Sequence, residues 1–202
     1  MPNDKPMSQD ATSHALRRAS GGRHGTRRLR IGALIVLALL IGFVLWLVLR
    51  GGSNSSSASP IPQGAKAVPI SLKALQTLSR LGIEMYWAGP RPGHTYELTK
   101  TSDNRVFIRY LPAGVSIGTD KPYLTVGTYP ARNAFAAIRR LATGADAVRI
   151  GVGKDGVAFY NRDAPESVLL AYRGSAFRVL VYDPSPDRAR QVVASGKVTT
   201  VK

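Results

Sequence analysis

The stretch 168-VLLAYRGSAFRVLVY-182 determines the fold class of this 202-residue chain. Two apolar runs, at 168–172 and 177–182, flank the short polar segment Arg-Gly-Ser-Ala at 173–176. Runs rich in Val, Leu and aromatic residues on either side of a glycine-containing turn are typical of a β-hairpin. The stretch therefore predicts two antiparallel strands.

Further elements are expected on both sides of this hairpin. A second hairpin is expected at 148–152 and 157–160, and a third at 96–101 and 105–111 with its turn at 102–104. Single strands are expected at 83–87 and 123–129, and helices at 70–81, 131–143 and about 187–194. This order predicts an α+β domain of residues 69–202, with a mainly antiparallel sheet and helices on one face.

Two of the expected helices have recognisable ends. Ser71 is a candidate N-cap for the helix at 70–81, and Gly82 follows its last apolar residue. Arg139 and Arg140 fall in the last turn of the helix at 131–143, and Gly144 follows it.

An uncharged run of 19 residues, 31-IGALIVLALLIGFVLWLVL-49, precedes this domain. At about 1.5 Å per residue, a helix of this length spans roughly 28 Å, close to the hydrocarbon thickness of a bilayer. A buried core helix seldom stays uncharged for so long, and the core of a cleaved signal peptide is shorter. The small residues at 57–59 leave cleavage open, but the run predicts one permanent transmembrane helix.

The flanks of this run predict its orientation. Residues 1–30 are expected to be a disordered basic tail, and residues 50–68 a Gly/Ser/Pro linker. Seven basic and two acidic residues precede the run, whereas only Arg50 follows it before Lys66. By the positive-inside rule the N-terminus is cytoplasmic, and the C-terminal domain is extracytoplasmic at the cell (inner) membrane.

A small-xxx-small spacing lies within the same run, at Ala38 and Gly42. Such a spacing lets two membrane helices approach closely. Weak self-association through this pair is therefore an open alternative to a monomeric anchor.

The sequence contains few residue combinations that enzymes use. Because it has no cysteine, disulfides, thiol catalysis and zinc–thiolate sites are excluded. His94 is the one histidine outside residues 1–30, and no metal or cofactor site is expected. The acidic residues are scattered, and Glu97 is expected on an exposed strand face. A non-catalytic binding or scaffolding domain is expected; the alternatives are an envelope enzyme that uses the His94 loop and a signalling protein whose tail contacts a regulator.

The aromatic residues of the domain concentrate on the expected strands, and about half of them have a basic residue nearby. This pattern is typical of surfaces that bind anionic or sugar-like polymers through charge and stacking, although strand aromatics also fill cores. Besides the lipid bilayer, the expected partner is an anionic envelope polymer or another envelope protein, and no nucleic acid is expected. The candidate ligand-binding residues are Tyr86, Trp87, Arg91, His94, Arg109 and Tyr110.

Three segments of the domain carry a resemblance. They are YWAGP at 86–90, YELT at 96–99 and TVGTYP at 125–130. In these segments the chain resembles a group of uncharacterised bacterial single-pass membrane proteins. The resemblance implies a bacterial envelope setting and carries no activity with it.

Overall fold

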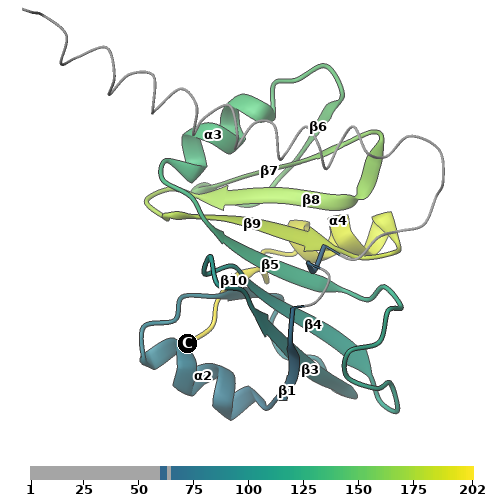
Figure 1. Cartoon of the computed structure of the whole chain (residues 1–202). Coiled ribbons are helices and arrows are strands. Elements are labelled where there is room, and N and C mark those ends of the chain that lie inside the picture. Colours follow the sequence, from purple (N-terminus) through teal and green to yellow (C-terminus); the bar gives the residue numbers. More distant parts are fainter. Residues whose placement is uncertain (1–59, 63–64) are drawn as a thin grey trace, which may run out of the picture. The chain divides into compact units, whose positions relative to one another are not determined.

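The computed structural model describes residues 60–62 and 65–202, which form an antiparallel sheet with helices packed on it (Figure 1). The predicted tail (1–30), the predicted transmembrane helix (31–49), the pair Ala38 and Gly42, and most of the predicted linker (50–68) lie outside the described residues. Among the residues that the structure describes, no helix is long and apolar enough to cross a membrane.

Eight strands form one antiparallel sheet in the order β1-β3-β4-β5-β9-β8-β7-β6. The strands are β1 Ala67–Ile70, β3 His94–Lys100, β4 Val106–Pro112, β5 Thr125–Pro130, β6 Ala147–Ile150, β7 Gly156–Asn161, β8 Ala164–Tyr172 and β9 Phe177–Tyr182. A separate antiparallel pair joins β2 (Tyr86–Trp87) to β10 (Thr199–Thr200). The predicted α+β class and the mainly antiparallel sheet, with its three hairpins, are confirmed.

The three helices of the described residues are α2 (Leu72–Arg80), α3 (Ala134–Leu141) and α4 (Pro186–Ala194). Ser71 caps α2 as expected, because its Oγ accepts a hydrogen bond of 3.1 Å from the Ala74 N–H. α3 begins three residues later than expected. The Ala131 N–H donates instead to the carbonyl of Ala176, which holds the chain at the sheet.

The helices do not all lie on one face of the sheet, so that part of the fold prediction is wrong. Val168 and Leu170 of β8 belong to one core cluster with α4, whereas Leu169 and Ala171 pack in a second cluster with α3. Successive side chains of a strand point to opposite faces, so α3 and α4 cover opposite faces. A strand with apolar side chains on both faces must be covered by other elements on both faces of the sheet.

Two short strands were not expected from the sequence. β1 includes Ala67 and Val68, the last two residues of the predicted linker, and pairs with β3. β10 pairs with β2, and Val201 beside it donates its N–H to the Met85 carbonyl at 3.0 Å. The expected strand at 83–87 is therefore reduced to two residues, held by a partner from the far end of the chain.

The strand register defines two ends of the sheet. At the linker end, β1 begins at Ala67 opposite Thr99 of β3, and the β3–β4, β6–β7 and β8–β9 turns lie at this end. At the distal end, β3 begins at His94 opposite Pro112 of β4. The main core cluster packs α2, the β2–β10 pair and α4 against one face between these ends.

Candidate functional site

The structure separates the six predicted binding residues. Arg109 and Tyr110 are neighbours on β4, so their side chains point to opposite faces of the sheet. Tyr110 belongs to the main core cluster, together with Tyr86 and Trp87. Arg109 lies on the other face, so the six residues do not form one group in the structure.

The aromatic rings of Trp87, Tyr96 and Tyr110 lie together in the main core cluster. The ring centres of Trp87 and Tyr96 are 6.5 Å apart, and those of Tyr96 and Tyr110 are 5.3 Å apart, both in edge-to-face geometry. The guanidinium of Arg91 lies 5.8 Å from the centre of the Tyr110 ring. Trp87, Arg91 and Tyr110 are candidate ligand-binding residues that lie together here, and Tyr96, which joins them, is not among the candidates.

The hydroxyls of this group hold the loop 88–93. The Tyr110 hydroxyl accepts a hydrogen bond from the Ala88 N–H at 2.7 Å and donates one to the Gly89 carbonyl at 3.1 Å. The Tyr96 hydroxyl accepts from the Arg91 N–H at 2.9 Å. The loop is thus fixed at three of its six residues, Ala88, Gly89 and Arg91, by two buried tyrosines.

Burial limits what these rings offer to a ligand. Tyr110 is 1% exposed and Trp87 is 9% exposed, and burial raises the pKa of Tyr110 well above its ordinary value. In this structure the rings position the loop 88–93, and the partly exposed Arg91 is the one charged residue of that loop. A direct contact between the rings and a ligand stays a prediction.

Tyr86 takes a different position, because β2 turns its ring toward the linker end. It stacks on Tyr172 with ring centres 5.7 Å apart, and its hydroxyl donates to Ser175 at 3.0 Å. Its N–H donates to the Thr128 hydroxyl of β5 at 2.8 Å. Burial raises the pKa of Tyr86, and the residue ties β2 to the sheet.

His94 begins β3 at the distal end. Its Nδ1 lies 3.0 Å from the Pro92 carbonyl, so the ring is engaged by its own loop. It borders a shallow, open groove lined by residues 69–72 and 94–96. Among the described residues, no group of His, Asp and Glu side chains could hold a metal ion.

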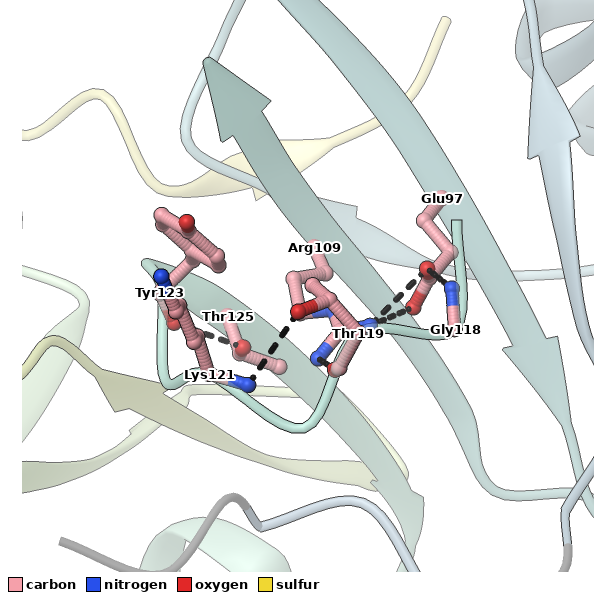
Figure 2. A network of polar contacts seen from close by, with 7 residues as sticks. All are labelled: Glu97, Arg109, Gly118, Thr119, Lys121, Tyr123 and Thr125. Atoms are coloured by element: carbon pink, nitrogen blue, oxygen red, sulfur yellow. Dashed lines mark hydrogen bonds and ion pairs between the residues drawn. The ribbon is translucent and has the colours of Figure 1, made fainter. Parts of the chain in front are cut away.

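On the other face of the sheet, Arg109 forms a buried ion pair with Glu97 (Figure 2). The two residues are direct cross-strand partners on β3 and β4. Arg109 Nη2 lies 2.7 Å from Glu97 Oε1 and 2.9 Å from Oε2, and Glu97 is 1% exposed. The expectation that Glu97 lies on an exposed strand face is wrong, since this face of β3 is covered.

The ion pair holds the long loop between β4 and β5, residues 113–123. The Gly118 N–H donates to Glu97 Oε2 at 2.6 Å, and Arg109 Nη1 donates to the Thr119 carbonyl at 2.7 Å (Figure 2). Inside the loop, the Lys121 N–H donates to the Thr119 hydroxyl at 3.3 Å. Each member of the pair therefore anchors one of two consecutive loop residues.

The two loops meet at the distal end. The Ala113 N–H donates to the Gly93 carbonyl at 3.1 Å, directly beside the pairing of His94 with Pro112. We call residues 88–93 and 113–123 together the distal loops. One is fixed by buried tyrosines and the other by a buried ion pair, on opposite faces of β3 and β4.

Comparisons of the chain with protein-family models, with curated proteins and with solved structures found no match.

Proposed function

We propose that this chain is a single-pass, membrane-anchored protein with a non-catalytic extracytoplasmic domain that binds an envelope partner through the distal loops. The uncharged run at 31–49 and the basic residues before it support the anchor and its orientation. The distal loops are the site, and an anionic envelope polymer is the partner.

The observation that carries this proposal is the buried Glu97–Arg109 pair. Burying two charges is costly, and a buried pair often stabilises a fold no more than well-packed apolar residues would. Here both charges also fix backbone groups of the loop 113–123. Binding residues are commonly found on loops that a rigid scaffold holds in place, so this cost is explained if the loop must keep one shape.

The charge of the distal loops favours an anionic partner. Arg91 is partly exposed and Lys121 is exposed, and neither forms an ion pair within the described part of the chain. Asp120 is the one acidic residue of these loops. Two cations on loops whose backbone is held in place suit phosphate or carboxylate groups along a polymer.

A co-sedimentation experiment tests this function. The full chain in detergent is mixed with isolated cell-wall polymer, and the bound fraction is measured for wild type and for Arg91→Ala/Lys121→Ala. The matched control, Arg139→Ala/Arg140→Ala, removes the same charge from the exposed side of α3. We expect a loss of binding in the loop variant alone, and an equal loss in both variants would reject the distal loops as the site.

A further inference from the structure

The two ends of the sheet differ in charge. Exposed basic side chains at the linker end are Lys66, Lys100, Arg132, Lys154 and Arg173. The acidic side chains are concentrated at the distal end: Asp120, Asp146, Asp163, Glu166, Asp183 and Asp187. The distal end also carries basic residues, so its charge is mixed, whereas the linker end is strongly positive.

Strand register places the basic residues at one end although they are far apart in sequence. Lys100 ends β3 and lies opposite Val106, where β4 begins. Arg132 follows β5, and the neighbouring Ala131 is hydrogen-bonded to Ala176 in the β8–β9 turn at 2.7 Å. That turn contains Arg173, whose N–H donates to the Asp155 carbonyl at 2.7 Å, beside Lys154. Figure 1 shows these ends of β5, β8 and β9 side by side, next to the start of α3.

The positive charge at the linker end is not neutralised within the protein. Three acidic residues lie there: Asp155, Glu84, whose charge acts on the Tyr86 hydroxyl beside Ser175, and Asp103, which already pairs with Arg105 at 2.8 Å. Within the described residues, none of the five basic side chains forms an ion pair. Their charges are therefore available to an external anion.

We infer that the linker end of the domain rests on the anionic lipid headgroups of the bilayer that holds the proposed anchor. The inference rests on the anchor in the proposed function and adds a second contact with the same membrane. The chain enters the sheet at Ala67, at this same end. Clusters of Lys and Arg close to a membrane segment are attracted to anionic lipids.

The length of the connection favours this contact over a distant one. Residues 50–66 join the proposed anchor to β1, and a fully extended chain of that length spans at most about 60 Å. A Gly/Ser-rich chain of this length has a root-mean-square span of roughly 23 Å. The basic end is thus confined near the headgroups, at an effective concentration that makes a weak interaction sufficient.

Because the sequence has no cysteine, single cysteines can report which end faces the membrane. The full chain is reconstituted into vesicles of phosphatidylcholine, with or without phosphatidylglycerol, whose headgroups carry an energy acceptor. A donor dye is attached at Ala176→Cys in the β8–β9 turn or at Ser116→Cys in the loop 113–123, both exposed positions. Energy transfer is then compared between the two positions, at low and at high salt.

We expect stronger energy transfer from position 176 than from position 116, in vesicles with phosphatidylglycerol only. Salt should remove the difference, because the Debye length falls from about 10 Å at 0.1 M to about 3 Å at 1 M. Lys100→Ala/Arg132→Ala/Lys154→Ala should weaken the contact by roughly 100-fold, since each basic residue near an anionic surface contributes about a fivefold factor. The control Arg139→Ala/Arg140→Ala/Arg162→Ala removes the same charge elsewhere and should leave the difference intact.

Each other result counts against the inference in a distinguishable way. Equal transfer from both positions, or an equal loss in both triple variants, overturns the contact and leaves the anchor standing. Flotation of the chain with vesicles at 1 M salt tests the anchor separately, and a chain that does not float overturns both the anchor and the contact that rests on it. Loss of binding to an anionic polysaccharide in the linker-end variant, without the lipid-dependent difference, would assign this end to a polymer.

Discussion

Arg109 has its guanidinium buried against the Glu97 carboxylate, with 5% and 0% of the two side chains exposed. Arg109→Ala would leave that carboxylate buried and would free the Thr119 carbonyl. We expect a loss of about 3–5 kcal/mol in the free energy of unfolding, as is usual when one partner of a buried pair is removed. Chemical denaturation of the full chain in detergent, followed by near-ultraviolet circular dichroism, measures it.

The matched control for this prediction is Arg139→Ala. Arg139 is an exposed arginine of α3 without an ion pair among the described residues. Its replacement should change the free energy of unfolding by less than about 0.5 kcal/mol. Similar losses in both variants would show that the Glu97–Arg109 pair does not stabilise the domain.

Gly127 on β5 is required for a packing reason. A Cβ at this position would lie 2.8 Å from Tyr129 Cε2 and 3.2 Å from the ring of Phe107, whose edge-to-face contact with Tyr129 closes over the glycine. Gly127→Ala should cost about 1–3 kcal/mol in thermal or chemical unfolding, as overpacking of a core does. Gly151→Ala is the control, because a Cβ there meets no atom within 4 Å, and a comparable cost at both sites would contradict the packing argument.

At the scale of the elements, the hairpins could be predicted because each one is encoded locally. The turn at 102–104 also predicts the strand register, that is, which residues of the two strands lie opposite each other. Glu97 and Arg109 lie equally far from Asp103, and the structure pairs them. Counting residues outward from the turn therefore predicts that Glu97 and Arg109 lie opposite each other and can form an ion pair. Its burial could not be predicted in the same way, because the loop that covers it contributes backbone groups, which no side-chain pattern reveals.

The elements that the sequence reasoning missed depend on distant partners. β10 has two residues and gains its partner from β2, more than a hundred residues earlier. The prediction that all helices lie on one face of the sheet is wrong for a related reason. The apolar run at 168–172 predicts a strand, but its second apolar face calls for a second covering helix. The periodicity of the predicted helix at 131–143 does not show which face of the sheet that helix covers.

The segment around β10 is expected to stabilise the whole domain. Val198 and Val201 are 0% and 2% exposed, and Val201 is hydrogen-bonded to Met85 beside β2. Removing residues 198–202 should therefore lower the free energy of unfolding by about 3–6 kcal/mol, from the loss of two buried valines. Denaturant titration measures the change, and removal of the exposed Lys202 alone is the control. A truncated chain as stable as this control would mean that β10 is dispensable.

Across the whole molecule, the two proposed contacts lie at opposite ends of the same strands. The distal loops are fixed where β3 begins and β4 ends, and the basic linker end is where the chain enters β1. An eight-stranded sheet joins the two ends rigidly, so a domain that rests on a membrane at the linker end presents the distal loops away from it. The direction of the strands thus places the proposed binding site and the proposed membrane contact at opposite ends of the sheet.

The core of the domain is expected to be sensitive to alkali, because burial keeps the phenols of four of its tyrosines neutral. Burial raises the pKa of Tyr129 and of Tyr172 to about 12, and it raises those of Tyr86 and Tyr110 as well. A pKa that is higher in the folded state than in the unfolded state favours the folded protein below the unfolded value of about 10. That contribution is lost as the pH rises from 10 to 12, by about 1.4 kcal/mol per pH unit for the buried Tyr129.

The domain should therefore unfold cooperatively between pH 10 and pH 12, and ionisation of Tyr86, Tyr110, Tyr129 and Tyr172 should accompany unfolding instead of preceding it. Absorbance at the phenolate band, recorded together with near-ultraviolet circular dichroism, measures both events on one sample. Tyr129→Phe keeps the ring on Phe107 and removes the ionisable hydroxyl, so its unfolding midpoint should shift to higher pH. Ionisation of all eight tyrosines near pH 10 with the fold intact would show that the Tyr110 ring is accessible to solvent, and would remove the basis for treating Tyr110 as a buried support of the loop 88–93.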